Sequence, residues 1–144
     1  MNRTAKPYPA RAAIGLVAAV AIGFAVIAAC NTVWAVVEGV PVTTLWEDDA
    51  VWAQIVIAAA PYLLLALLGV GARRPWIVAL CLTAAFWGFY LFVITRPYEG
   101  GGANIGLGLL MIFSPLPITA ASLIALATVA NRRGPDAIAA DRDA

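Results

Sequence analysis

Four long apolar stretches without a charged residue constrain this chain more than any other feature. They cover residues 12–37, 50–70, 76–95 and 105–130, and none of them contains Lys, Arg, Asp or Glu. An α-helix rises about 1.5 Å per residue, so about 20 apolar residues cross a hydrocarbon core of about 30 Å. The stretches lack the alternation that is typical of a transmembrane β-barrel. The sequence therefore predicts an all-α fold, an integral membrane four-helix bundle.

The composition leaves little room for anything else. Of the 144 residues, 63% are hydrophobic and 12% are charged, whereas a soluble domain is about 45–50% apolar and about 25% charged. Outside the four stretches, the chain has a short polar N-terminal arm, short connections and a polar C-terminal tail. We therefore expect one membrane domain over residues 1–144 and no soluble catalytic domain.

The basic residues predict the orientation of the bundle. Eight of the nine Lys and Arg residues fall on one side of the predicted helices, and Arg96 alone falls on the other. Because cytoplasmic loops carry the excess of Lys and Arg, both termini are predicted to be cytoplasmic. The excess of Arg over Lys and the abundance of Ala indicate a bacterium with a GC-rich genome. The predicted location is therefore the bacterial inner membrane, which the chain crosses several times.

Prolines occur near the middle of the second and fourth stretches. The second contains Pro61, and the fourth contains Ser114-Pro115-Leu116-Pro117. Each proline removes a backbone donor and clashes with the preceding turn, so the closely spaced pair predicts a kink or break over Ser114–Pro117. Transporters use broken helices near the membrane midplane as binding sites. A purely structural kink that shapes the bundle is the alternative.

Polar side chains gather at the predicted outer ends of the helices. Polar residues within a membrane usually face the interior of a bundle, because an amide without a partner is costly in hydrocarbon. We expect a shared outer cluster that serves as the entrance of a transport path or as a clasp between helices. Asn104 could alternatively act as the N-cap of the fourth helix. The candidate vestibule or clasp comprises Asn31, Glu38, Gln54, Arg96, Glu99 and Asn104.

Small residues recur at four-residue spacing on the predicted helices. Gly15, Ala19 and Gly23 form one row on the first helix, and Ala84 and Gly88 form another on the third. Lipid tails are as apolar as Leu, so membrane helices associate through close contact and interhelical hydrogen bonds. The rows could pack the helices of the bundle together. They could also bind a second copy of the chain or another membrane protein.

Five aromatic residues crowd the second half of the third helix. They point in too many directions to form one face, which favours packing and lipid contact over a cradle for a hydrophobic ligand. The residues are Phe86, Trp87, Phe89, Tyr90 and Phe92.

The residue types exclude much of enzyme chemistry. Histidine is absent, which removes imidazole acid–base catalysis, His-ligated haem and the Ser-His-Asp triad. Cys30 and Cys81 are predicted to lie at different depths, which excludes a disulfide between them and predicts two free, buried thiols. We therefore expect no catalytic residues, no metal site and no cofactor. The net charge of +1 does not suggest nucleic acid as a partner.

These observations favour a small non-catalytic membrane protein over an enzyme. The leading interpretation is a structural, accessory or interaction subunit, surrounded by the lipid bilayer. The alternative is a small channel or transporter built on the outer vestibule and a broken fourth helix.

Overall fold

The computed structural model describes residues 8–96 and 104–142, and no strand occurs among them. Four segments are long and apolar enough to span a membrane, which confirms the prediction of an all-helical protein with four candidate spans. The predicted site residue Glu99 lies outside the described residues. The elements are α1 (Tyr8–Glu38), the short 3-10 helix η1 (Val42–Glu47), α2 (Asp49–Leu67), α3 (Arg73–Ile94), α4 (Ile105–Phe113) and α5 (Pro115–Arg142).

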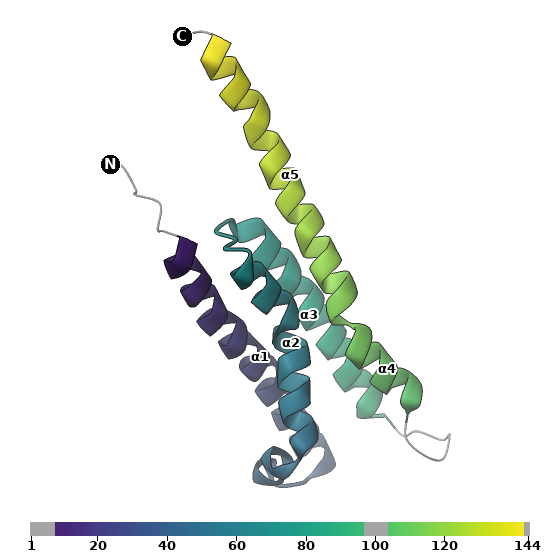
Figure 1. Cartoon of the computed structure of the whole chain (residues 1–144). Helices are drawn as coiled ribbons and strands as arrows, with labels where there is room; N and C mark the ends of the chain where they lie inside the picture. Colours follow the sequence, from purple (N-terminus) through teal and green to yellow (C-terminus); the bar gives the residue numbers. More distant parts are fainter. Residues whose placement is uncertain (1–7, 97–103, 143–144) are drawn as a thin grey trace.

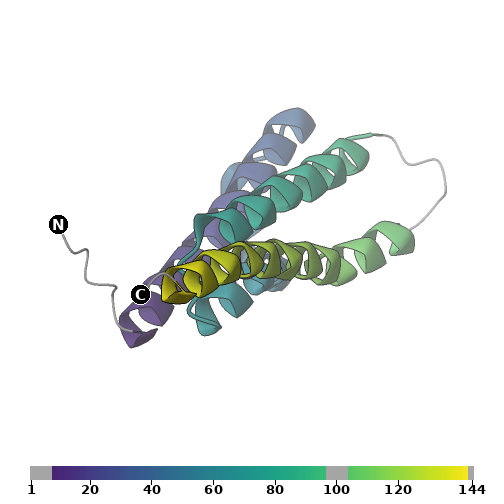
Figure 2. The ribbon, with the colours of Figure 1, turned by 90° about the horizontal axis from the view of Figure 1, so that it is seen from above.

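The helices form two hairpins that lie side by side. The first consists of α1 and α2, and the second of α3 with α4 and α5. The start of α1, the α2–α3 turn and the far end of α5 share one end of the bundle, called here the terminal end (Figure 1; Figure 2). The opposite end, called the loop end, holds η1 and the start of α4.

Helix α2 is the most deeply packed element. Eight of its residues are buried, against five in α1 and four in α3, and it contacts α1, α3 and α5. Pro61 is one of these buried residues, and α2 continues through it from Asp49 to Leu67.

The small-residue row on α1 brings the backbones of α1 and α2 close together. A Cβ atom built on Gly15 would lie 2.8 Å from the Cβ of Ala66, and one built on Gly23 would lie 2.7 Å from the Cβ of Ala59. Ala19, between the two glycines, is fully buried. This row therefore packs within the chain. On α3, a Cβ built on Gly88 would meet no described atom within 4 Å.

Hydrogen bonds at the α2–α3 turn connect three helices at the terminal end. Gly69 adopts a left-handed φ of 63°, and its N–H donates to the Ala66 carbonyl at 2.9 Å, which satisfies one of the last carbonyls of α2. The Tyr8 hydroxyl donates to the Leu67 carbonyl. Trp76 Nε1 donates to the Val70 carbonyl at 3.0 Å. These bonds connect the beginning of α1, the end of α2 and the beginning of α3.

The last helix ends later in the chain than the sequence predicts. The apolar span ends at Asn131, close to the expected position 130, but α5 continues to Arg142. The extension runs through Gly134 and Pro135, the residue types with the lowest helix propensity. Neither the apolar run nor local propensity therefore predicts it.

Candidate functional site

The polar side chains predicted at the loop end have separate surroundings. Glu38 is the last residue of α1 and is exposed. Asn104 is exposed as well, and its Oδ1 accepts a hydrogen bond from the Leu107 N–H at 3.0 Å. The expectation that Asn104 caps the fourth helix is therefore confirmed. The guanidinium carbon of Arg96 lies 4.1 Å from the centroid of the Phe92 ring.

The two remaining amides are half-buried. Asn31 follows the buried Ile27 by four residues and precedes the buried Ala35 by four, so it continues the α1 face that packs on α2. Its Nδ2 is buried and has no hydrogen-bond partner among the described residues. Gln54 belongs to α2. Within residues 8–96 and 104–142, no hydrogen bond joins two members of the candidate vestibule. Their convergence stays a prediction.

A buried hydrogen bond between helices lies elsewhere. The Tyr62 hydroxyl of α2 donates to Thr83 Oγ1 of α3 at 2.9 Å, and both side chains are buried. Sequence reasoning missed this pair, although a buried Tyr usually finds a partner for its hydroxyl. Tyr62 is five residues from the end of α2, toward the terminal end. It packs in an apolar cluster with Ala19, Leu65, Ala79 and Ile118.

The segment predicted to be kinked or broken contains the boundary between α4 and α5 at Ser114. Ser114 keeps helical backbone angles, with φ −55° and ψ −33°, and the kink stays a prediction. Its N–H and its hydroxyl both donate to the Met111 carbonyl, at 3.2 and 2.8 Å. Pro115 has no N–H for that carbonyl, so Ser114 supplies the missing donors. Pro117 likewise cannot donate to the Phe113 carbonyl.

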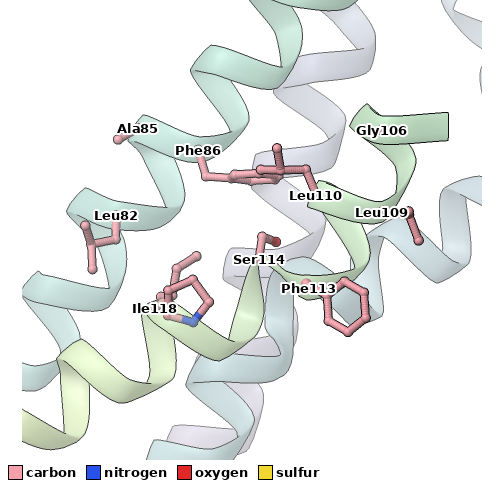
Figure 3. A pocket seen from close by; sticks show the side chains of 10 residues that line it. Leu82, Ala85, Phe86, Gly106, Leu109, Leu110, Phe113, Ser114 and Ile118 are labelled. Atoms are coloured by element: carbon pink, nitrogen blue, oxygen red, sulfur yellow. The ribbon is translucent and has the colours of Figure 1, made fainter. Parts of the chain in front are cut away.

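A cavity of about 670 Å³ lies beside this boundary, between α3, α4 and the first turn of α5 (Figure 3). Its lining is apolar except for Ser114, which is 5% exposed. Figure 3 shows Leu82 and Phe86 of α3 on one side, and Leu110 and Ile118 on the other. The complete lining is Leu82, Ala85, Phe86, Gly106, Leu109, Leu110, Phe113, Ser114, Pro117 and Ile118.

The aromatic residues of α3 have three different surroundings. Trp87 is buried and meets Phe86 edge-on, with ring centroids 5.6 Å apart. Phe86 lines the cavity, while Phe89 and Phe92 are about half exposed on the outside of the bundle. The expectation that these residues do not share one face is confirmed.

The cysteines agree only partly with the sequence expectation. Both thiols are free, as expected. Cys81, however, is exposed and Cys30 is half-buried, so the expectation of two buried thiols is wrong. Cys81 lies on the same outward face of α3 as Ala84 and Gly88, which are also exposed. Among the described residues, no three potential Cys, Asp or Glu ligands gather to hold a metal ion.

Comparisons with known proteins do not assign this chain to a group. No protein-family model, curated protein or solved structure matches it.

Proposed function

We propose that the chain is a non-catalytic integral membrane protein that acts as a structural, accessory or interaction subunit in a bacterial inner membrane. The observation that carries this proposal is that buried apolar side chains fill the bundle at two positions along its length. Toward the loop end, a second cluster packs α1, α2 and α3 together, in addition to the cluster around Tyr62. This second cluster comprises Ile27, Val51, Ile55, Ala58 and Trp87.

The buried hydroxyl side chains Thr83, Ser114 and Ser122 favour the same proposal, because each of them is bonded within the chain, whereas the half-buried Asn31 keeps an unbonded Nδ2. Thr83 accepts from Tyr62, and Ser114 donates to the Met111 carbonyl. Ser122 donates to the Ile118 carbonyl at 2.7 Å. A transported polar solute needs groups that are free to replace its hydration, and these hydroxyls are already engaged with the protein.

The outward small-residue row on α3 is the surface proposed for the interaction. Ala84 and Gly88 are exposed, and the space beside Gly88 is open. Small residues let a second helix approach closely in a membrane. The partner would be another membrane protein or a second copy of this chain, with the lipid bilayer covering the rest of the surface.

The interaction is tested by affinity purification in a mild detergent, followed by mass spectrometry. Gly88→Leu should reduce recovery of the partner or the second copy, because Leu would fill the row. Gly108→Leu is the matched control, since Gly108 also has no atom of the described residues within 4 Å of its Cβ position but lies on α4. Equal recovery with both variants would contradict the proposed surface.

The proposed orientation places both termini in the cytoplasm, as the basic residues predict. Single cysteines are introduced at Glu47 and at Ala72 in a chain whose own cysteines are replaced by Ala. A membrane-impermeant thiol reagent added to intact cells should label position 47 and spare position 72. The reverse pattern would contradict the orientation.

Transport is the second candidate, and the boundary at Ser114 is the observation that favours it. We interpret Ser114–Pro117 as a kink. Ser114 follows Asn104 by ten residues, about 15 Å of helical rise, which is half of a hydrocarbon core of about 30 Å. Ion and solute flux from proteoliposomes should equal that of protein-free vesicles if the accessory role is correct. Flux that exceeds this level and falls in a Pro115→Leu, Pro117→Leu double variant would favour transport instead.

A further inference from the structure

The chemistry of the cavity between α3, α4 and α5 selects an apolar occupant. Its volume of about 670 Å³ falls within the range of about 300–1,000 Å³ that is common for ligand pockets. Ser114 contributes the hydroxyl, and this group already donates to the Met111 carbonyl. A bound water needs two to four polar partners, and an ion needs more. The cavity therefore suits a molecule that binds through dispersion and burial of hydrocarbon.

The extent of the cavity along the bundle matches a lipid chain of one leaflet. Its lining runs along α4 and α5 from Gly106 to Ile118, which is about 18 Å of helical rise. One leaflet contributes half of the hydrocarbon core, about 15 Å. Gly106 is the second residue of α4, and Ile118 is midway along the candidate span Ile105–Asn131, so the cavity extends from the loop end to the middle of that span.

A basic residue lies where the head group of such a lipid would be. Ala85 and Phe92 are seven residues apart and lie on one face of α3, and Arg96 follows the end of α3 at Ile94 by two residues. The Arg96 guanidinium lies over the Phe92 ring. Ala85 lines the cavity, and α3 ends nine residues further on at Ile94, after about 14 Å of helical rise toward the loop end. A phosphate at this level would meet a positive charge.

The loose attachment of α4 leaves room for the chain to enter from the side. Leu107 is the buried residue of α4, whereas Leu109, Leu110 and Phe113 are each more than half exposed. Protein interiors are close-packed, and the walls of an empty gap lose dispersion contacts. In a bilayer, hydrocarbon is the material available to fill such a gap.

We infer that this cavity binds one acyl chain of a phospholipid from the loop-end leaflet, with the lipid phosphate beside Arg96. The site is thus a lipid-binding groove built into the second hairpin. It does not depend on the proposed accessory role.

Photocrosslinking tests this inference with the full-length chain. The protein is reconstituted into phosphatidylcholine vesicles that contain a phosphatidylglycerol probe with a diazirine near the middle of one acyl chain. After illumination, labelled peptides are mapped by mass spectrometry. Labelling should concentrate on Phe86, Leu110 and Phe113. Ile112 and Val20 serve as references, because they are similarly exposed on the outside of the bundle but do not line the cavity.

Two neighbouring alanines provide a matched pair of variants. Ala85→Trp fills the cavity and should lower labelling of its lining by about tenfold, which corresponds to about 1.4 kcal/mol of affinity. Ala84→Trp places the same ring on α3 outside the cavity and should leave labelling unchanged. Even if Ala85→Trp fails to fold, the distribution of label in the unaltered chain still decides the question.

Three outcomes would overturn the inference. One is labelling of the cavity lining no stronger than that of Ile112 and Val20, as expected for ordinary lipid contact or for an α4 that closes onto α3. Another is equal labelling in the Ala84→Trp and Ala85→Trp variants. The third is crosslinking of the cavity to a second copy of the chain, which would make it a protein interface. Arg96→Gln should weaken labelling by the phosphatidylglycerol probe, and unchanged labelling would overturn the assignment of the phosphate to Arg96.

Discussion

The two hairpins are built from similar apolar helices but pack very differently. In the α1–α2 hairpin, Gly15 and Gly23 face Ala66 and Ala59 so closely that a Cβ on either glycine would clash. In the second hairpin, Gly88 on α3 has open space beside it, and a cavity separates part of α3 from α4. Small residues thus bring helices together only where they face a partner that is also small.

The prolines of the two hairpins show the same dependence on context. Pro61 is buried within α2, and the helix continues through it. At Pro115 and Pro117, two prolines separated by one residue remove the donors for the Met111 and Phe113 carbonyls. There α4 ends at Phe113 and α5 begins at Pro115. The packed helix α2 thus tolerates the loss of one backbone N–H donor at Pro61. The loss of two such donors, at Pro115 and Pro117, occurs where α4 meets α5.

The largest expected effect comes from overfilling the tight hairpin. Gly23→Leu would place its Cβ 2.7 Å from the Ala59 Cβ and 2.8 Å from the Ile55 carbonyl oxygen. Because backbone atoms cannot move aside cheaply, we expect a loss of about 3 kcal/mol or more in the free energy of unfolding. Unfolding by a denaturing detergent, followed by circular dichroism, measures this loss.

Gly88→Leu is the control for this substitution in the open hairpin. The space beside Gly88 is free, so the free energy of unfolding should change by less than about 0.5 kcal/mol. A similar loss in both variants would mean that the two hairpins do not differ in packing as described.

An intermediate effect is expected at Asn31, within the tight hairpin. Its Nδ2 is buried without a hydrogen bond among the described residues, and such a group costs about 1–3 kcal/mol. Asn31→Leu should therefore stabilise the protein by about 1 kcal/mol, which would be measured as a higher midpoint of thermal unfolding in detergent. If the amide instead joins helices as a polar clasp, the same variant will lower the midpoint.

The smallest effect concerns the hydrogen bond that connects the two hairpins. Tyr62→Phe and Thr83→Val each remove one partner of the 2.9 Å bond between α2 and α3. A double-mutant cycle should give a coupling free energy of about 0.6 kcal/mol, the average for such bonds in a membrane protein. A coupling near zero would mean that apolar packing alone holds the hairpins together.

The agreement between sequence and structure is closest where long-range contacts are not needed. The four spans follow from uninterrupted apolar runs, and the N-cap at Asn104 follows from local side-chain chemistry. The extension of α5 to Arg142 was missed because the apolar run ends earlier than the helix. The exposure of Cys81 was missed because the face of α3 that points outward depends on where its neighbours lie.

The sequence by itself determined that this chain is helical and has four segments able to span a membrane, because a bilayer requires every backbone group to be bonded within its own segment. It also predicts a kink over Ser114–Pro117, since proline lacks a donor wherever it occurs. Only the tertiary structure decided which small-residue row packs against another helix, that Tyr62 pairs with Thr83, and that a cavity lies beside α4. These features depend on how helices that are distant in the chain are rotated and spaced. Apolar side chains have similar hydropathy, so the hydropathy of each residue does not predict that arrangement.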